Sequence, residues 1–96
     1  MLTRETILSI IKSNKPYFVK ELGVKSIGLF GSYARGNQKV DSDIDVLIEM
    51  PANYDHLCIV WKLLEKETGL KIDLVRLGPH LTEPFLNDIQ KEIIYA

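Results

Sequence analysis

The sequence is poor in the residues that build disulfide frameworks and membrane spans. Cys58 is its only cysteine, which excludes an internal disulfide and suits a reducing compartment. No apolar run approaches the ~20 residues of a membrane helix. Arg4 and Glu5 stand ahead of Ile7 and Leu8 without the organisation of a signal peptide. We therefore expect a cytoplasmic protein with no membrane segment.

The length of 96 residues predicts a single domain, residues 1–96, with one core. Its charge is unevenly spread: residues 1–39 carry seven Lys or Arg against two acids, and residues 40–96 carry five against eleven. No basic stripe of the kind that an extended nucleic-acid footprint needs is evident. The split fits a small anionic ligand held by the first part and cations held by the second. Uneven surface charge without a function is the alternative.

Helix-like and strand-like segments alternate along the chain. We predict helices over 3–13, from about Pro16 to Gly23, over 55–68 and over 82–90, with strands at 24–30, 44–49, 71–76 and, at an edge, 93–95. Thr3, Asp55 and Thr82 are the expected N-caps. The link between the first two strands is too short for a parallel crossover. We therefore predict an α+β fold of two layers, in which a small mixed sheet of three to four strands is covered by helices.

A glycine-serine turn follows the first predicted strand, in the segment Gly31-Ser32-Tyr33-Ala34-Arg35-Gly36. Gly31 allows the backbone to turn sharply and approach a ligand. Ser32 begins a helical turn whose free N–H groups attract phosphate. Arg35 lies on the same side of that turn and can reach either a phosphate or an acidic neighbour. Because Gly-Ser turns are common, the segment alone is a weak signal of phosphate binding.

Three aspartates support a functional interpretation of this turn. Asp43 and Asp45 open the second strand at i and i+2, so their side chains project to the same face. Asp73 lies inside a later strand and joins them if the two strands are neighbours. Three carboxylates about 5 Å apart repel by roughly 3 kcal/mol per pair at an effective dielectric of ~20, which a cation would relieve. Oxygen ligands of this kind suit Mg²⁺ or Mn²⁺.

Other readings of the same residues are weaker. Asp41, Asp43 and Asp45 match the first three ligands of a calcium-binding EF-hand loop, but Val46 and Ala52 stand where that loop needs Gly and Glu. His56 and His80 are separated in the sequence and fit surface or capping positions. We interpret Asp41 as a loop cap, and Tyr33 as a packing residue rather than a platform for a base. Ser32 has no His and Asp in register for a nucleophilic triad.

The combination of Gly31-Ser32, ten further residues, Asp43-Ile44-Asp45 and a later strand aspartate, Asp73, resembles the nucleotidyltransferase superfamily that includes DNA polymerase β. It is most similar to the minimal members of that superfamily, the MNT antitoxins of the MntA family. The resemblance spans essentially the whole chain. It implies that Asp43, Asp45 and Asp73 are catalytic and bind two Mg²⁺ ions. It also implies that Gly31 and Ser32 hold the triphosphate of ATP, and we add Arg35 to this nucleotide-binding set from its place in the turn.

The resemblance further implies a partner. In the MNT family the reaction moves AMP from ATP onto a tyrosine of a HEPN-domain ribonuclease toxin, so we expect such a toxin to be the partner. Assembly with itself or with a partner is compatible with the sequence. The alternatives are a non-catalytic toxin-binding module and a free-standing nucleotidyltransferase acting on RNA or a small molecule. The helix over 55–68 has an apolar arc wider than one buried face needs, including Leu57, Cys58 and Trp61, which either packs under its neighbours or docks a second protein.

Overall fold

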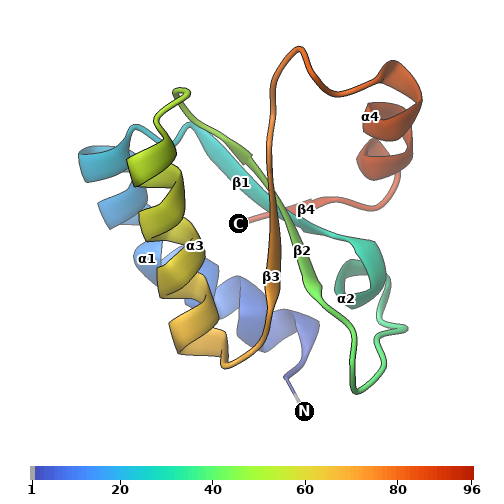
Figure 1. The fold of residues 1–96 in the computed structure, drawn as a ribbon. Coiled ribbons are helices and arrows are strands. Elements are labelled where there is room, and N and C mark those ends of the chain that lie inside the picture. The colour runs from blue at the N-terminus through green and yellow to red at the C-terminus, as the bar shows by residue number, and fades with distance from the viewer. Residues whose placement is uncertain (1) are drawn as a thin grey trace.

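A computed structural model describes residues 2–96 as a four-stranded mixed sheet with helices on both faces (Figure 1). The strand order is β3-β2-β1-β4, in which β1 pairs antiparallel with β2 and β4, and β2 pairs parallel with β3. The elements are α1 (Arg4–Leu22), β1 (Ser26–Phe30), α2 (Gly31–Arg35), β2 (Ile44–Glu49), α3 (Tyr54–Thr68), β3 (Ile72–Arg76), α4 (Glu83–Gln90) and β4 (Ile94–Tyr95). The predicted α+β class and mixed sheet are confirmed.

The first helix differs from the prediction, because α1 continues through Pro16 as one helix of 19 residues. Proline removes one backbone hydrogen bond from a helix interior. Pro16 and Lys12, whose carbonyl loses that bond, are both exposed, so water can replace the missing donor. The buried residues Ile7, Ile11, Phe18 and Leu22 form one stripe across the proline. Burial of this stripe against the sheet keeps the helix continuous.

The helix ends largely follow the sequence signals. The side chains of Thr3 and Thr82 accept hydrogen bonds from the third residue after each, as predicted for N-caps. The N-cap of α3 is Asn53, whose side chain accepts from the His56 N–H, so the assignment of Asp55 to this position was wrong. Asp55 instead lies in the first turn of α3, where its charge complements the helix dipole.

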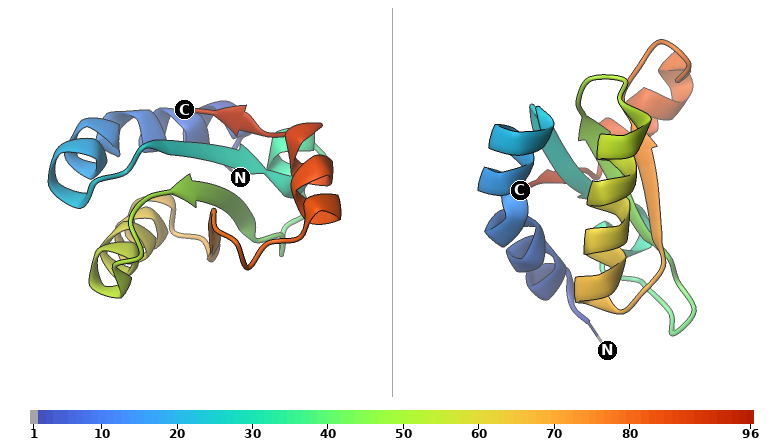
Figure 2. Two further views of the ribbon diagram at one scale, coloured as in Figure 1. Left: turned by 90° about the horizontal axis from the view of Figure 1, so that it is seen from above. Right: turned by 60° about the vertical axis from the view of Figure 1, so that its left-hand side comes forward.

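The two faces of the sheet are covered by different helices and hold apolar clusters of different size. Helices α1 and α3 lie side by side over one face, and α4 lies over the other, as the view from above shows (Figure 2). The main core under α1 and α3 includes the alternate strand residues Ile27, Leu29, Ile44, Val46, Ile48, Ile72 and Leu74. A smaller cluster joins Phe30 and Leu47 to Ile89 of α4. No helix within residues 2–96 is both long and apolar enough to cross a membrane.

Removing a buried side chain of α3 should destabilise the fold through the main core. Leu64 is fully buried between α3 and the sheet, and replacement of a buried leucine by alanine costs ~2–5 kcal/mol through lost contacts and a residual cavity. We expect Leu64→Ala to lower the free energy of unfolding in urea by this amount. Ile59→Ala on the same helix is the control, because Ile59 is 39% exposed and should cost well under half as much. Equal costs would contradict this assignment of the core.

Candidate functional site

Gly31 begins α2 directly after β1 and adopts φ +76°, in the left-handed region that favours glycine. A Cβ atom at this position would overlap the Asp45 carboxylate. Gly31 therefore has two reasons to be glycine: the sharp turn from strand to helix and the close approach of Asp45. Gly36, which also has a positive φ, ends α2 as predicted.

The sheet brings Asp45 and Asp73 together. β2 and β3 are parallel neighbours, and Asp45 lies directly opposite Asp73 in their register. Both residues alternate with buried residues of the main core, so their side chains are on the opposite face, the one that carries α4. Asp43, two residues earlier, is exposed and precedes the strand. All three predicted acids thus belong to the same end of the sheet.

The start of β3 is held in place by α3 from its outer edge. The indole Nε1–H of Trp61 donates to the Ile72 carbonyl at 2.7 Å, and the Ile72 N–H donates to Glu65 Oε2 at 3.0 Å. Both backbone groups of Ile72 on this edge are therefore satisfied by side chains. The two bonds position the neighbouring Asp73. They also give Trp61 a structural role, and Leu57 and Cys58 of the predicted apolar arc are likewise half-buried.

The carboxylates influence each other electrostatically. Burial raises the pKa of Asp45 from 3.8 to about 6, with further contributions from the charge of Asp73, a hydrogen bond to it, and the charges of Asp43 and Glu92. A neighbouring carboxylate disfavours ionisation, and a cation would reverse this effect. The acids that act on Asp45, namely Asp73, Asp43 and Glu92, all carry carboxylate oxygens, the ligand type that a hard cation prefers.

The three predicted metal ligands do not form one compact cluster. Within residues 2–96, no group of three or more His, Cys, Asp or Glu side chains stands close enough to hold a metal ion. Asp45 and Asp73 are paired across β2 and β3, and the charge of the exposed Asp43 contributes to the raised pKa of Asp45. The carboxylates of Asp43, Asp45 and Asp73 fit Mg²⁺ or Mn²⁺ in their chemistry. Metal binding by these three residues stays a prediction.

The predicted phosphate-binding residues lie on α2, and two of them contact an acid that the sequence pattern did not reveal. Glu92, just before β4, accepts hydrogen bonds from the Gly31 N–H and from Arg35 Nη1, the latter at 2.8 Å. Ser32 is half-buried in the first turn of α2. Tyr33 is buried, which confirms its role in packing.

A cavity of about 340 Å³ lies between α2, Asp45 and α4. Its lining comes from β1, α2, β2, α4 and the segment between α4 and β4: Phe30, Gly31, Arg35, Asp45, Phe85, Asp88, Ile89 and Glu92. Phe30 and Phe85 meet edge to face, with ring centroids 6.2 Å apart, and give the cavity one aromatic wall. The residues from α4 onward were missed because they come from a segment more than 40 residues away from the glycine turn. No local motif marks them.

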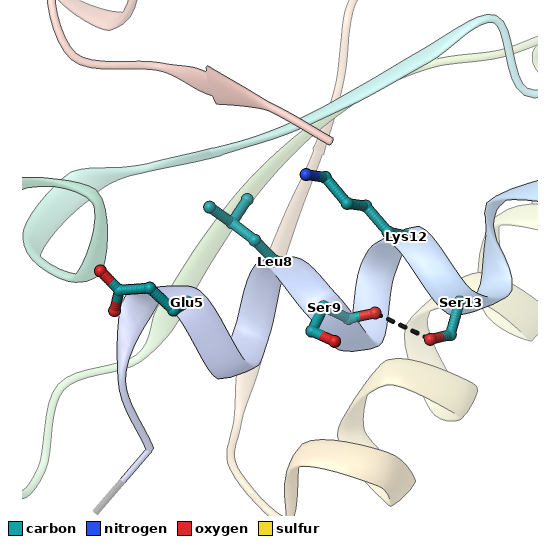
Figure 3. A pocket seen from close by; sticks show the side chains of 5 residues that line it. All are labelled: Glu5, Leu8, Ser9, Lys12 and Ser13. Carbon is teal, nitrogen blue, oxygen red and sulfur yellow. Dashed lines mark hydrogen bonds between the residues drawn. The ribbon is translucent and has the colours of Figure 1, made fainter.

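A second hollow, of about 500 Å³, lies on the outer side of α1 (Figure 3). It is lined by Glu5, Leu8, Ser9, Lys12 and Ser13, all from this one helix. The Ser13 hydroxyl donates to the Ser9 carbonyl, a bond within the helix. None of the predicted site residues takes part, and the hollow contains no cluster of reactive groups. The candidate site is therefore the cavity beside Asp45.

Comparisons with known proteins show the family of the chain. The nucleotidyltransferase domain family matches residues 6–95 of the chain. The protein adenylyltransferase MntA of Thermococcus cleftensis is 35% identical over 102 residues, covering 100% of this chain and 98% of that protein. These matches cover both the glycine turn and the three acids.

Two solved structures show the same fold. A candidate minimal nucleotidyltransferase superposes with a TM-score of 0.80 at 22% identity, covering 97% of this chain and 95% of that one. One chain in the structure of a tri-AMPylated Shewanella oneidensis HEPN toxin in complex with MNT antitoxin superposes with a TM-score of 0.57 at 18% identity. The match covers 96% of this chain and 66% of that chain. At these identities the similarity concerns the fold.

The close approach of Asp45 makes Gly31 more sensitive to substitution than Gly36. Both have a positive φ, which costs a non-glycine residue ~1–2 kcal/mol, but a Cβ at Gly36 would meet nothing within 4 Å. We expect Gly36→Ala to lower the free energy of unfolding by about 1 kcal/mol, and Gly31→Ala by at least twice that. Urea denaturation measures both. Similar losses would show that Asp45 does not constrain the turn.

The raised pKa of Asp45 predicts a pH-dependent penalty on folding. Because this pKa is higher in the folded chain, at about 6, than in the unfolded one, stability falls as the pH rises from about 4 through 6. A shift of this size is partly screened, since Asp45 is half-exposed, so we expect about 1 kcal/mol. Asp45→Asn should therefore be more stable than the natural protein at pH 8 in EDTA, by a few degrees in Tm. The difference should vanish near pH 4, and a pH-independent difference would contradict the assignment.

Proposed function

The chain belongs to the nucleotidyltransferase domain family, and from this membership we propose that it transfers AMP from ATP to a hydroxyl group of a partner protein. The observation that carries the proposal is the register of Asp45 with Asp73 beside the Gly31 turn. Asp45 lines the cavity together with Gly31 and Arg35 of the predicted anion site, and its strand partner Asp73 is the second carboxylate. We assign the activity to a single domain, residues 1–96, acting in the cytoplasm.

In this proposal each residue has one task. Gly31, Ser32 and Arg35 bind the triphosphate through backbone N–H groups, a hydroxyl and a guanidinium. Asp43, Asp45 and Asp73 would hold Mg²⁺, or Mn²⁺, which supplies neutralisation of the triphosphate charge and favours the ionised form of the acceptor. Asp73, the more exposed of the paired acids, takes the proton from the acceptor hydroxyl.

The bond changes follow from this arrangement. The acceptor oxygen forms a bond to the α-phosphorus of ATP, and the bond from that phosphorus to the bridging oxygen of the β-phosphate breaks. Pyrophosphate leaves with the bonding electrons, and the hydroxyl proton passes to Asp73. AMP stays on the acceptor as a phosphodiester. Correct alignment of the two reactants contributes much of the rate in reactions of this type.

We propose that the acceptor is a tyrosine of a HEPN-domain toxin. The relatives support this: one is named a protein adenylyltransferase, and another protein of the same fold forms a complex with an AMPylated HEPN toxin. The cavity also suits an aromatic acceptor. Phe30 and Phe85 provide an apolar wall close to Asp45, against which a tyrosine ring can pack while its hydroxyl faces the carboxylates.

The first test is transfer to the partner. We expect incubation with a HEPN-domain protein encoded beside this gene, ATP and Mg²⁺ to add mass to that protein in steps of one AMP. Asp45→Asn and Asp73→Asn should each lower the rate about a thousandfold, since ~4 kcal/mol of transition-state stabilisation is lost. Asp41→Asn is the matched control, because Asp41 is an exposed loop residue, and should retain the natural rate. Mass spectrometry of the intact partner measures the transfer by the natural protein and by each of the three variants.

The other outcomes distinguish the alternatives. A partner that binds but gains no mass would indicate a non-catalytic binding module. An unmodified partner together with adenylylated RNA or metabolite would indicate a free-standing nucleotidyltransferase. Transfer that survives both aspartate substitutions would refute the proposed site, and loss of activity in Asp41→Asn would extend the acidic site into the preceding loop.

A further inference from the structure

One carboxylate, that of Glu92, contacts two of the groups that we assign to the triphosphate. Its Oε2 accepts the Gly31 N–H, and its Oε1 lies 2.8 Å from Arg35 Nη1. Gly31 and Arg35 are the first and last residues of α2. A single acid, 57 residues beyond Arg35 in the sequence, therefore spans the whole turn that the sequence identifies as a phosphate cradle.

The position of Glu92 is held by the backbone on both sides. The Ile93 N–H donates to the Ile89 carbonyl at 2.8 Å, and the following residue, Ile94, pairs with Leu29 of β1. The side chain of Ile93 lies against Gly28, where a Cβ would stand 2.8 Å from it. The Glu92 side chain is only 22% exposed. The contact with α2 is thus part of how the C-terminal segment packs.

A carboxylate and a phosphate require the same partners. Both accept hydrogen bonds from backbone N–H groups and from guanidinium. The Gly31 N–H is a single donor, and Glu92 already occupies it. A second anion at this N–H would also repel the first, so the two anions have to bind there in turn.

We propose that Glu92 is an internal competitor of the nucleotide. Its carboxylate and the triphosphate of ATP bind to Gly31 and Arg35 in alternation, and nucleotide binding moves the Glu92 side chain off α2. This inference rests on the proposed function, because it takes the triphosphate to be the ligand of α2. It also links the occupied site to β4, whose first residue is only two positions beyond Glu92. Glu92 thereby sets the nucleotide affinity without contacting the reacting atoms.

Calorimetric titration of the protein with MgATP tests the competition. Glu92→Gln keeps the shape of the side chain and removes its charge. It should bind MgATP about tenfold more tightly, because a charge-assisted contact of the competitor is lost. Glu83→Gln is the matched control: Glu83 is an exposed residue of α4 outside the cavity, and the same loss of charge there should change the affinity less than twofold.

Each result decides between the two proposals. Equal or weaker binding by Glu92→Gln, with binding by the natural protein, would overturn the competition and leave the proposed function intact, with Glu92 as a residue that orders α2. Binding by Glu92→Gln alone would support the competition in its strongest form. Absence of binding in both would overturn both proposals. A tightening of the same size in Glu83→Gln would show that overall charge, rather than the contact with α2, determines the affinity.

A measurement on the natural protein makes the test independent of how well the variant folds. Nuclear magnetic resonance can follow the Gly31 amide and the side-chain carboxyl carbon of Glu92 during titration with MgATP. If nucleotide replaces the carboxylate, both signals shift together with one dissociation constant. A shift at Gly31 without a change at the Glu92 carboxyl carbon would show that the two anions do not compete.

Discussion

The register of three adjacent strands is the constraint on which the rest of this site depends. Phe30, the last residue of β1, pairs with Asp45, and Asp45 pairs with Asp73 across the parallel β2–β3 ladder. This row of three residues puts the glycine turn, which begins one residue after Phe30, beside two carboxylates. Because side chains alternate along a strand, a slip of one residue would turn Asp45 into the main core. Burial of Ile44, Val46 and Ile48 on the other face prevents that slip.

The apolar face and the acidic face of the sheet therefore have opposite effects on the stability of the fold. The main core under α1 and α3 stabilises the register, and the same register forces Asp45 close to Asp73. The raised pKa of Asp45 records this unfavourable contact. Proteins that hold acidic groups together for chemistry accept such a loss of stability at the site. Here the loss falls on the face that carries α4 and the smaller cluster, so the larger core remains free of charged residues.

The C-terminal segment completes the site from the far end of the chain. It supplies Phe85 and Ile89 from α4 to the wall of the cavity, and it brings Glu92 onto α2. The candidate site thus consists of an acidic part on the sheet and a predicted phosphate-binding part on α2. The C-terminal segment contacts α2 through Glu92 and joins the sheet through the short strand β4.

Local patterns in the sequence were sufficient for the elements and for the candidate residues. Short apolar runs identified the four strands, and capping residues marked the starts of α1 and α4, because both signals act over a few neighbouring positions. The same locality explains the errors. Pro16 was interpreted as the start of a new helix, because the hydrogen bond that proline removes is visible in the local sequence. The burial of Phe18 and Leu22, which compensates for that loss, depends on the tertiary structure. Asp55 and Asn53 are both suitable caps, and only the path of the chain entering α3 selects Asn53.

The spacing of residues in the chain was enough to identify candidates for the chemistry: a glycine that can turn at 31, an arginine at 35 and acids spaced to share one face of a strand. Only the tertiary structure decided which of them meet. The parallel pairing of β2 with β3 joins Asp45 to Asp73 while Asp43 stays exposed, and the packing of α4 and β4 brings Glu92 to Gly31 and Arg35. The physical reason is that strand pairing and burial act between segments distant in the chain, so no local spacing of residues encodes their outcome.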